Sequence, residues 1–230
     1  MYFGLESGHT MLLLLIGIIV TMSAQFKINK AFKKYLNIRA NSGLTGADIA
    51  RKILEKNGLS NIYVVETNGY LSSHYDPSRK TVRLEKNIYE GSSIAAISVA
   101  AHEVGHAIQD KENYSFMIIR SKLVPLVNLV SYLGYFSLFI SIFGGLTSYL
   151  MLSIIVLLAT ILFQLVTLPV EFDASSRAKK ELEKLNLVNN EEVVGVSKML
   201  NAAAFTYVAS LATSLLQLLR LVLIFSNNDD

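Results

Sequence analysis

The sequence predicts a mainly α-helical membrane protein with about four transmembrane helices and a small cytosolic α+β module. Hydrophobic residues make up 52% of its 230 residues, and its mean hydropathy of +0.41 is high for an ordinary soluble domain. Charged residues are absent from three long segments, which are residues 7–25, 123–170 and 199–219. Nearly all Lys and Arg residues lie between these segments, as they do in loops that stay in the cytosol.

Each charge-free segment is long enough for transmembrane helices, because the bilayer core requires about 20 apolar residues per helix. The first segment predicts one helix near residues 8–26, and the last predicts one near residues 203–225. The middle segment predicts two helices and a turn between them, at Gly144, Gly145, Thr147 and Ser148. No basic residues precede the first helix, which favours an uncleaved anchor over a cleaved signal peptide.

The distribution of Lys and Arg predicts a multi-pass protein of the cell membrane with both termini external. Of the 21 such residues, fifteen lie from Lys27 to Lys122 and five from Arg177 to Lys198. Basic loops stay in the cytosol, so both of these loops are expected there. The lone Arg220 can reach the membrane interface with its long side chain. The net charge of +3 implies no nucleic-acid partner, because the basic residues cluster beside membrane helices, where anionic lipid attracts them.

These patterns divide the chain into five parts. They are an N-terminal transmembrane anchor (1–26), a cytosolic module (27–122), a transmembrane hairpin (123–170), a cytosolic helical segment (171–202) and a C-terminal transmembrane helix (203–230).

The cytosolic module is expected to begin with a short amphipathic helix. Thr45 and Asp48 have the spacing of a capping box, in which each side chain accepts a hydrogen bond from the backbone of the other residue. Apolar residues then recur at helical spacing. The helix is expected to end at Asn57 and Gly58.

A small sheet and a second helix are expected to follow. β-branched residues at Ile62–Val65 and Thr81–Leu84 predict strands, with a turn at Asp76–Ser78. Two serines then precede the run Ile94–Gln109, which is rich in Ala and free of Pro. Serine is a good N-cap and Ala a strong helix former, so this run predicts a helix. Its small, apolar residues indicate that the helix is buried.

This run contains the sequence His-Glu-Val-Gly-His at residues 102–106. In a helix, His102 and His106 are one turn apart and about 40° apart around the axis, so both imidazoles can bind one metal ion. Glu103 flanks the pair and suits a general base that accepts a proton from water. A surface helix on which these side chains merely coincide is the alternative. The apolar surroundings argue against it, because burying these groups unpaired is costly.

The expected metal is Zn²⁺, and the chain has no cysteine to bind it. A catalytic zinc has three protein ligands and one open position. His9 lies at the external start of the first helix, so a carboxylate is the preferred third ligand. Glu171 directly follows the third predicted helix, which returns the chain to the cytosolic face. A helix-capping role at the membrane interface is the alternative for Glu171.

Three segments resemble a known family. A His-Glu-x-x-His helix and a later Glu-aromatic-x-Ala segment, separated by a transmembrane hairpin, resemble the gluzincin membrane peptidases. Leu71–Pro77, Ala100–Ala107 and Pro169–Ala174 more specifically resemble the bacterial YugP-type zinc metallopeptidases, over nearly the whole chain. The resemblance implies a zincin-like cytosolic module, with His102, His106 and Glu171 as zinc ligands and Glu103 as catalytic acid and base.

Two positions depart from the family pattern. Ser73 stands where an acidic residue is expected before His74, and Ser175 stands where related gluzincins often carry an Asp that orients a ligand histidine. Asp173 is a candidate to replace that Asp. His74 is a candidate to hydrogen-bond the oxyanion formed during attack, and a turn histidine packed against Tyr75 is the alternative.

The predicted function is a membrane zinc metalloendopeptidase that hydrolyses peptide bonds at the cytosolic membrane face by Glu103-assisted attack of zinc-bound water. Thr81–Leu84 is expected to present a strand edge to an extended peptide, so the expected substrates are unfolded or membrane-associated peptides and proteins. The alternative is a non-enzymatic membrane scaffold with a structural zinc site, which requires four ligands. A transporter ranks last, because the central hairpin carries no charged residue.

Overall fold

The computed structural model describes residues 8–144 and 150–226. Most of the predicted hairpin turn, at Gly145, Thr147 and Ser148, therefore lies outside the described residues. The chain divides into two compact units. The first, here called the helical unit, comprises residues 1–25, 119–168 and 206–230, and the second, the mixed unit, comprises residues 26–118 and 169–205.

These units can be compared with the five predicted parts of the chain. The predicted boundaries follow residues 26, 122, 170 and 202, and the observed ones follow residues 25, 118, 168 and 205. The mixed unit is therefore assembled from two separate stretches of sequence.

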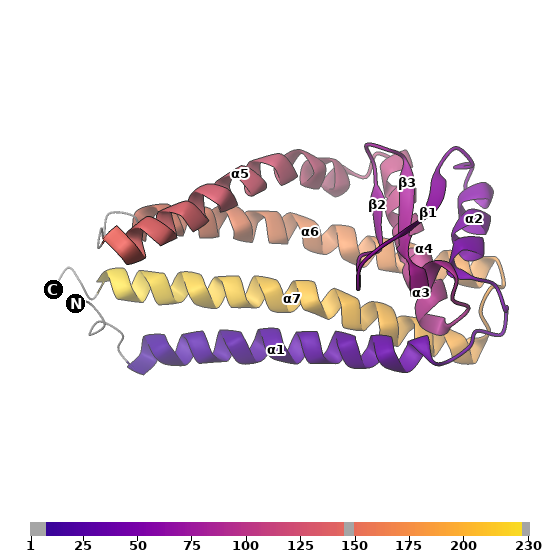
Figure 1. Ribbon diagram of the computed structural model, residues 1–230, viewed down its shortest axis with the longest axis horizontal. Coiled ribbons are helices and arrows are strands. Elements are labelled where there is room, and N and C mark those ends of the chain that lie inside the picture. Colours follow the sequence, from indigo (N-terminus) through magenta and orange to yellow (C-terminus); the bar gives the residue numbers. More distant parts are fainter. Residues whose placement is uncertain (1–7, 145–149, 227–230) are drawn as a thin grey trace. The chain divides into compact units, whose positions relative to one another are not determined.

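Four long helices supply the helical unit (Figure 1). They are α1 (Gly8–Leu36), α5 (Ser115–Gly144), α6 (Leu150–Lys184) and α7 (Asn190–Ser226). Within the described ranges, these four helices are long and apolar enough to cross a bilayer. The charge-free part of α6 ends at Val170.

Small and polar residues join α1, α6 and α7 inside the helical unit. The hydroxyl oxygens of Thr21 and Thr213 lie 3.1 Å apart, and Gln164 Nε2 donates to Ser210 Oγ at 2.9 Å. Between apolar helices in a membrane, such hydrogen bonds and small residues are the usual means of association.

The mixed unit contains one three-stranded sheet in the order β1-β3-β2. Its strands are β1 (Tyr63–Thr67), β2 (His74–Asp76) and β3 (Thr81–Glu85). β1 is parallel to β3 and β2 is antiparallel to it. The expectation that Thr81–Leu84 presents an edge is therefore wrong, because β3 is the central strand and is hydrogen-bonded on both sides. The open edges belong to β1 and β2.

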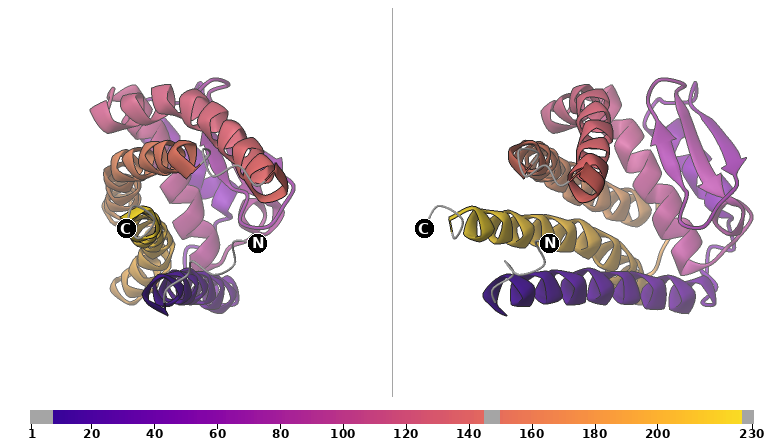
Figure 2. Two further views of the ribbon diagram at one scale, coloured as in Figure 1. Left: turned by 90° about the vertical axis from the view of Figure 1, so that its left-hand side faces the viewer. Right: turned by 60° about the vertical axis from the view of Figure 1, so that its left-hand side comes forward.

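Helices α2 (Gly46–Lys56) and α4 (Ile94–Lys111) contact this sheet (Figure 2), and a short helix α3 (Lys86–Tyr89) follows β3. The predicted capping box is confirmed, since Asp48 N donates to Thr45 Oγ1 at 3.1 Å and Thr45 N donates to Asp48 Oδ2 at 3.1 Å. The predicted serine N-cap of α4 is also confirmed, with Ala96 N donating to Ser93 Oγ at 3.2 Å.

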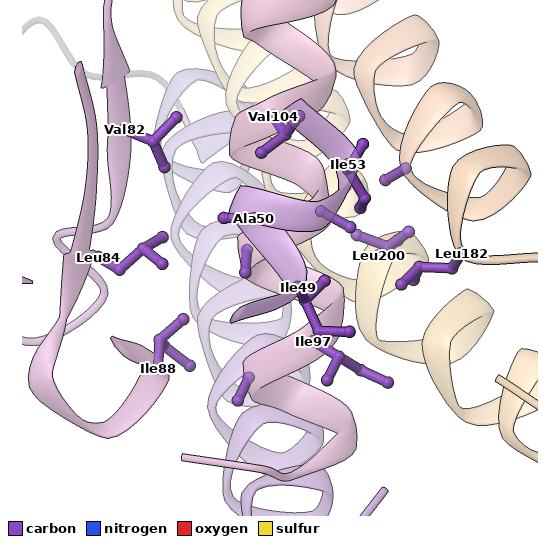
Figure 3. Close-up of a cluster of buried hydrophobic side chains, with 14 of the residues drawn as sticks. Ile49, Ala50, Ile53, Val82, Leu84, Ile88, Ile97, Val104, Leu182 and Leu200 are labelled. Atoms are coloured by element: carbon purple, nitrogen blue, oxygen red, sulfur yellow. The ribbon is translucent and has the colours of Figure 1, made fainter. Parts of the chain in front are cut away.

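Helix α4 lies in the centre of the mixed unit. Most of its residues are buried, and apolar side chains of α2, α3, β3, α6 and α7 pack in the same core (Figure 3), among them Ile49, Ile53, Val82, Leu84, Ile88, Ile97, Val104, Leu182 and Leu200. Full burial of one such side chain contributes about 1.5–3 kcal/mol relative to exposure. The core therefore holds α4 on several sides and limits its movement.

Candidate metal centre

The two motif histidines project from adjacent turns of α4. The ring centroids of His102 and His106 are 4.8 Å apart, with an angle of 83° between the rings. His106 is 6% exposed and Glu103 7%, whereas the side chain of His102 is 15% exposed. The pair therefore lies within the mixed unit, with His102 nearest to solvent.

Glu171 of α6 meets this pair. Its Oε2 atom lies 3.3 Å from Nε2 of His102 and 3.7 Å from Nε2 of His106. One potential ligand atom from each of the three residues lies within 4.8 Å of the others. The structure thus brings together the three side chains that the sequence analysis selected from two distant segments.

A close approach between α4 and α6 makes this meeting possible. A Cβ atom added at Gly105 would lie 2.6 Å from the carbonyl oxygen of Ala174, which is shorter than any normal contact. Glycine at this position lets the two backbones come close. This role of Gly105 was not predicted from the sequence, although its place inside the His-Glu-x-x-His motif was a usable signal.

A buried glutamine contacts the second histidine. Nδ1 of His106 lies 2.9 Å from Oε1 of Gln109, whose Nε2 donates to Oδ2 of Asp173 and to the carbonyl oxygen of Val170, both at 2.8 Å. Sequence reasoning missed Gln109. Its position three residues after His106 puts both side chains on one face of the helix, and that was the available signal.

A hydroxyl contacts the first histidine. Ser175 Oγ lies 3.2 Å from Nδ1 of His102. Ser175 therefore occupies the place where related gluzincins often carry an Asp. Asp173, the candidate to replace that Asp, contacts Gln109 and Arg177, and it reaches His106 only through Gln109.

The centre is electrostatically compensated. Burial favours the neutral form of Glu171, but the neighbouring His102 and His106 outweigh it and hold the pKa of this carboxyl well below its usual range. Nearby, burial favours neutral Arg177, yet its bonds to Asp173 and Glu112 raise the pKa of the guanidinium. An ionised Glu171 between two imidazoles is a suitable donor set for a cation.

His74 is not brought to this group. It lies on β2, where the side chain is exposed and Nδ1 is 2.8 Å from the carbonyl oxygen of Ser72. The alternative of a turn histidine is wrong, because His74 belongs to a strand whose neighbouring side chains point to opposite faces. Ser73 accepts a hydrogen bond from the backbone of Glu85 at 3.0 Å, which ties the chain before β2 to the end of β3.

Another predicted neighbour of His74 has a structural contact of its own. The Tyr75 hydroxyl donates to Asp110 Oδ2 at 2.7 Å, linking β2 to α4. Burial, followed by this hydrogen bond, raises the pKa of Tyr75 above its usual range. His9 lies on α1 and is exposed.

The donor set fits zinc. Two imidazole nitrogens and one carboxylate oxygen form a three-ligand set found at catalytic zinc sites, where a fourth position stays open. Among the described residues, the group comprises these three side chains. Each imidazole also has a partner at its other nitrogen, which is a usual feature of zinc-binding histidines.

Comparisons with known proteins agree with this chemistry. A family described as "putative neutral zinc metallopeptidase" matches residues 10–226. The "putative membrane protease YugP" of Bacillus subtilis (strain 168) is 47% identical over 207 residues, which cover 90% of this chain and 92% of the relative. No solved structure matches the chain significantly.

Proposed function

Because the chain belongs to the family described as "putative neutral zinc metallopeptidase", we propose that it is a membrane zinc endopeptidase acting at the cytosolic face of the cell membrane. The observation that carries this proposal is the meeting of His102, His106 and Glu171 within 4.8 Å. The four apolar helices and the relative's description as a membrane protease support the membrane assignment.

The proposed chemistry divides into holding the metal and moving a proton. His102 and His106 bind through Nε2 and Glu171 through a carboxylate oxygen. Zinc supplies a Lewis acid that polarises the scissile carbonyl and makes water more acidic. The carboxylate of Glu103 accepts a proton from the attacking water and delivers it to the leaving amine, so no covalent intermediate with the protein forms.

The substrates we propose are unfolded or membrane-associated polypeptides. Glu171 directly follows a charge-free segment of membrane length, which favours substrates held at the membrane. The basic loops on both sides of that segment support a cytosolic site. A structural zinc site in a scaffold requires a fourth ligand, and the described part of the chain supplies three in this group.

Metal analysis and proteolysis of the purified protein in detergent test this function together. The parent should contain zinc and cleave a labelled unfolded reporter polypeptide. Glu103→Gln should retain zinc and lose at least about 100-fold in cleavage rate, as expected for removal of a general base. Glu171→Ala should lose bound zinc while the protein remains folded.

Glu66→Gln is the matched control, because Glu66 is an exposed carboxylate on β1 and should behave like the parent. Undiminished cleavage by Glu103→Gln would remove this residue from the mechanism. A parent that binds zinc but cleaves no reporter would favour the scaffold.

A further inference from the structure

We propose that Gln109 is a positioning residue, which fixes the proton of His106 on Nδ1 and holds Glu171 at the metal centre. The proposal rests on the proposed zinc function, because it assigns Gln109 a part in preparing the zinc ligands. Gln109 is fully buried on α4. Its amide makes three contacts, all with residues that are zinc ligands or lie within two positions of one.

The orientation of the amide follows from its neighbours. The carbonyl oxygen of Val170 can only accept hydrogen bonds, so the NH₂ group of Gln109 must face it, and Asp173 Oδ2 lies on the same side of the amide. Oε1 then faces Nδ1 of His106 at 2.9 Å. Because Oε1 can only accept, His106 must carry its proton on Nδ1, and its Nε2 lone pair is directed to the side where Glu171 lies, 3.7 Å away.

The same amide fixes the part of α6 that carries Glu171. Val170 and Asp173 flank Glu171 in the sequence, and Gln109 Nε2 holds both at 2.8 Å. A buried amide that is left without its partners destabilises the fold. The contacts of Gln109 are therefore best satisfied when α6 is docked on α4 in the position that brings Glu171 to the histidines.

Arg177 supports this arrangement from the far side of Asp173. It donates to Asp173 through Nε and to Glu112, just after the end of α4, through Nη1 at 2.6 Å. These two bonds hold the Asp173 carboxylate in place beside the Gln109 amide. Arg177 thus acts on His106 indirectly, because it contacts Asp173, which contacts Gln109, which contacts His106.

A merely structural link between helices is the competing explanation, and the proton position on His106 separates the two. In metal-free protein, His106 can place its proton on Nδ1 toward Gln109 or on Nε2 toward Glu171. Gln109→Leu removes the first acceptor but preserves apolar packing, so the proton should move to Nε2. Gln109→Glu retains an oxygen acceptor toward His106 and should keep the proton on Nδ1, although it loses the donor to Val170 and Asp173.

Nitrogen-15 NMR of the histidine side chains provides the measurement, and the chain has only four histidines to assign. Spectra are recorded on metal-free protein in detergent, at a pH where the imidazoles carry a single proton. Zinc affinity is then measured by titration and should fall about 10- to 100-fold in Gln109→Leu. Gln164→Leu is the control, because it removes another interhelical amide contact, outside the metal centre.

Gln109→Met provides a second test should Gln109→Leu fail to fold. It also removes the oxygen acceptor while an unbranched apolar side chain fills the space, so the His106 proton should again move to Nε2. The proposal is overturned if the parent already carries the proton on Nε2, if the proton stays on Nδ1 in both variants, or if Gln109→Leu binds zinc within about twofold of the parent. None of these readings needs peptide cleavage, so they remain decisive for Gln109 even if the parent proves to be a non-enzymatic zinc protein.

Discussion

Gly105 of α4 faces Ala174 of α6 so closely that a Cβ atom on the glycine would lie 2.6 Å from the alanine carbonyl oxygen. Alanine is the better helix former by about 1 kcal/mol, so glycine at this buried helical position is explained by the approach of α6. Ala174 also lies three residues after Glu171. The spacing of the two backbones therefore sets how near Glu171 comes to His102 and His106.

Gly105→Ala is expected to push α6 away from α4 and lower zinc affinity by at least about 10-fold, in the range seen when the support of metal ligands is disturbed. Zinc titration of purified protein checks this. Gly8→Ala is the matched control, because a Cβ atom at that helical glycine meets nothing within 4 Å. Equal zinc affinity in Gly105→Ala and Gly8→Ala would show that the helix contact does not control the centre.

Ser175 is expected to support His102 through its contact with Nδ1. Ser175→Ala removes that partner, and zinc affinity should fall by about 10-fold. Ser175→Asp supplies a carboxylate, which accepts a stronger hydrogen bond from an imidazole N–H than a hydroxyl does, so its affinity should equal or exceed that of the parent. The order Asp, Ser, Ala in zinc titrations is the expected result, and an alanine variant that binds as tightly as serine would contradict it.

Local sequence signals predicted the parts of the fold that depend on neighbouring residues. The capping box of Thr45 and Asp48, the N-cap at Ser93 and the buried helix after it all follow from residues within one or two turns. The His-Glu-x-x-His spacing likewise belongs to one helix. Glu171 could also be predicted from the sequence, because a membrane hairpin is expected to return the chain to the side on which it began.

Long-range contacts could not be predicted from the sequence in the same way. β2 has three residues, and its pairing with β3 depends on tertiary context more than on composition. The sequence therefore did not reveal that β2 pairs with β3, and Thr81–Leu84, which was expected to present an edge, lies in the central strand β3. The contact of Gln109 with Asp173 joins side chains on separate helices, and a single sequence contains no local pattern that requires it.

The capping box predicts a specific dependence of stability on pH. The Thr45 hydroxyl, which donates to Asp48 Oδ2 at 2.6 Å, is the main cause of a lowered pKa at Asp48, from an ordinary value of 3.8. A carboxyl with a lowered pKa in the folded state stabilises the fold above its unfolded value, and this contribution is lost as the pH falls through the folded value.

Asp48→Asn should therefore lower the Tm at about pH 7, and the difference from the parent should narrow below pH 3.8. Thermal unfolding in detergent at several pH values measures it. In a Thr45→Val background, which lacks the hydroxyl donor, the same substitution should show a smaller dependence on pH. A difference that stays constant down to about pH 2 would mean that Asp48 gains nothing from its charge in the folded protein.

The orientation of the chain can be tested directly, because the absence of cysteine allows single cysteines to be introduced as labels. Lys52→Cys places a thiol on the exposed side of α2, and Ser226→Cys places one at the end of α7. The Lys and Arg distribution predicts that a membrane-impermeant maleimide labels Ser226→Cys in intact cells. Lys52→Cys should react only after the membrane is permeabilised, since its loop is expected in the cytosol.

The reverse labelling pattern would place the metal centre outside the cell and exclude cytosolic substrates. Labelling of both thiols in intact cells would place residues 52 and 226 on the same side of the membrane. The prediction that an odd number of helices crosses the bilayer between them would then be wrong. α5, α6 and α7 are the described helices beyond Lys52 that are long and apolar enough to cross, and three crossings place residues 52 and 226 on opposite sides. One labelled thiol and one protected thiol is therefore the result that both the charge distribution and the helix count require.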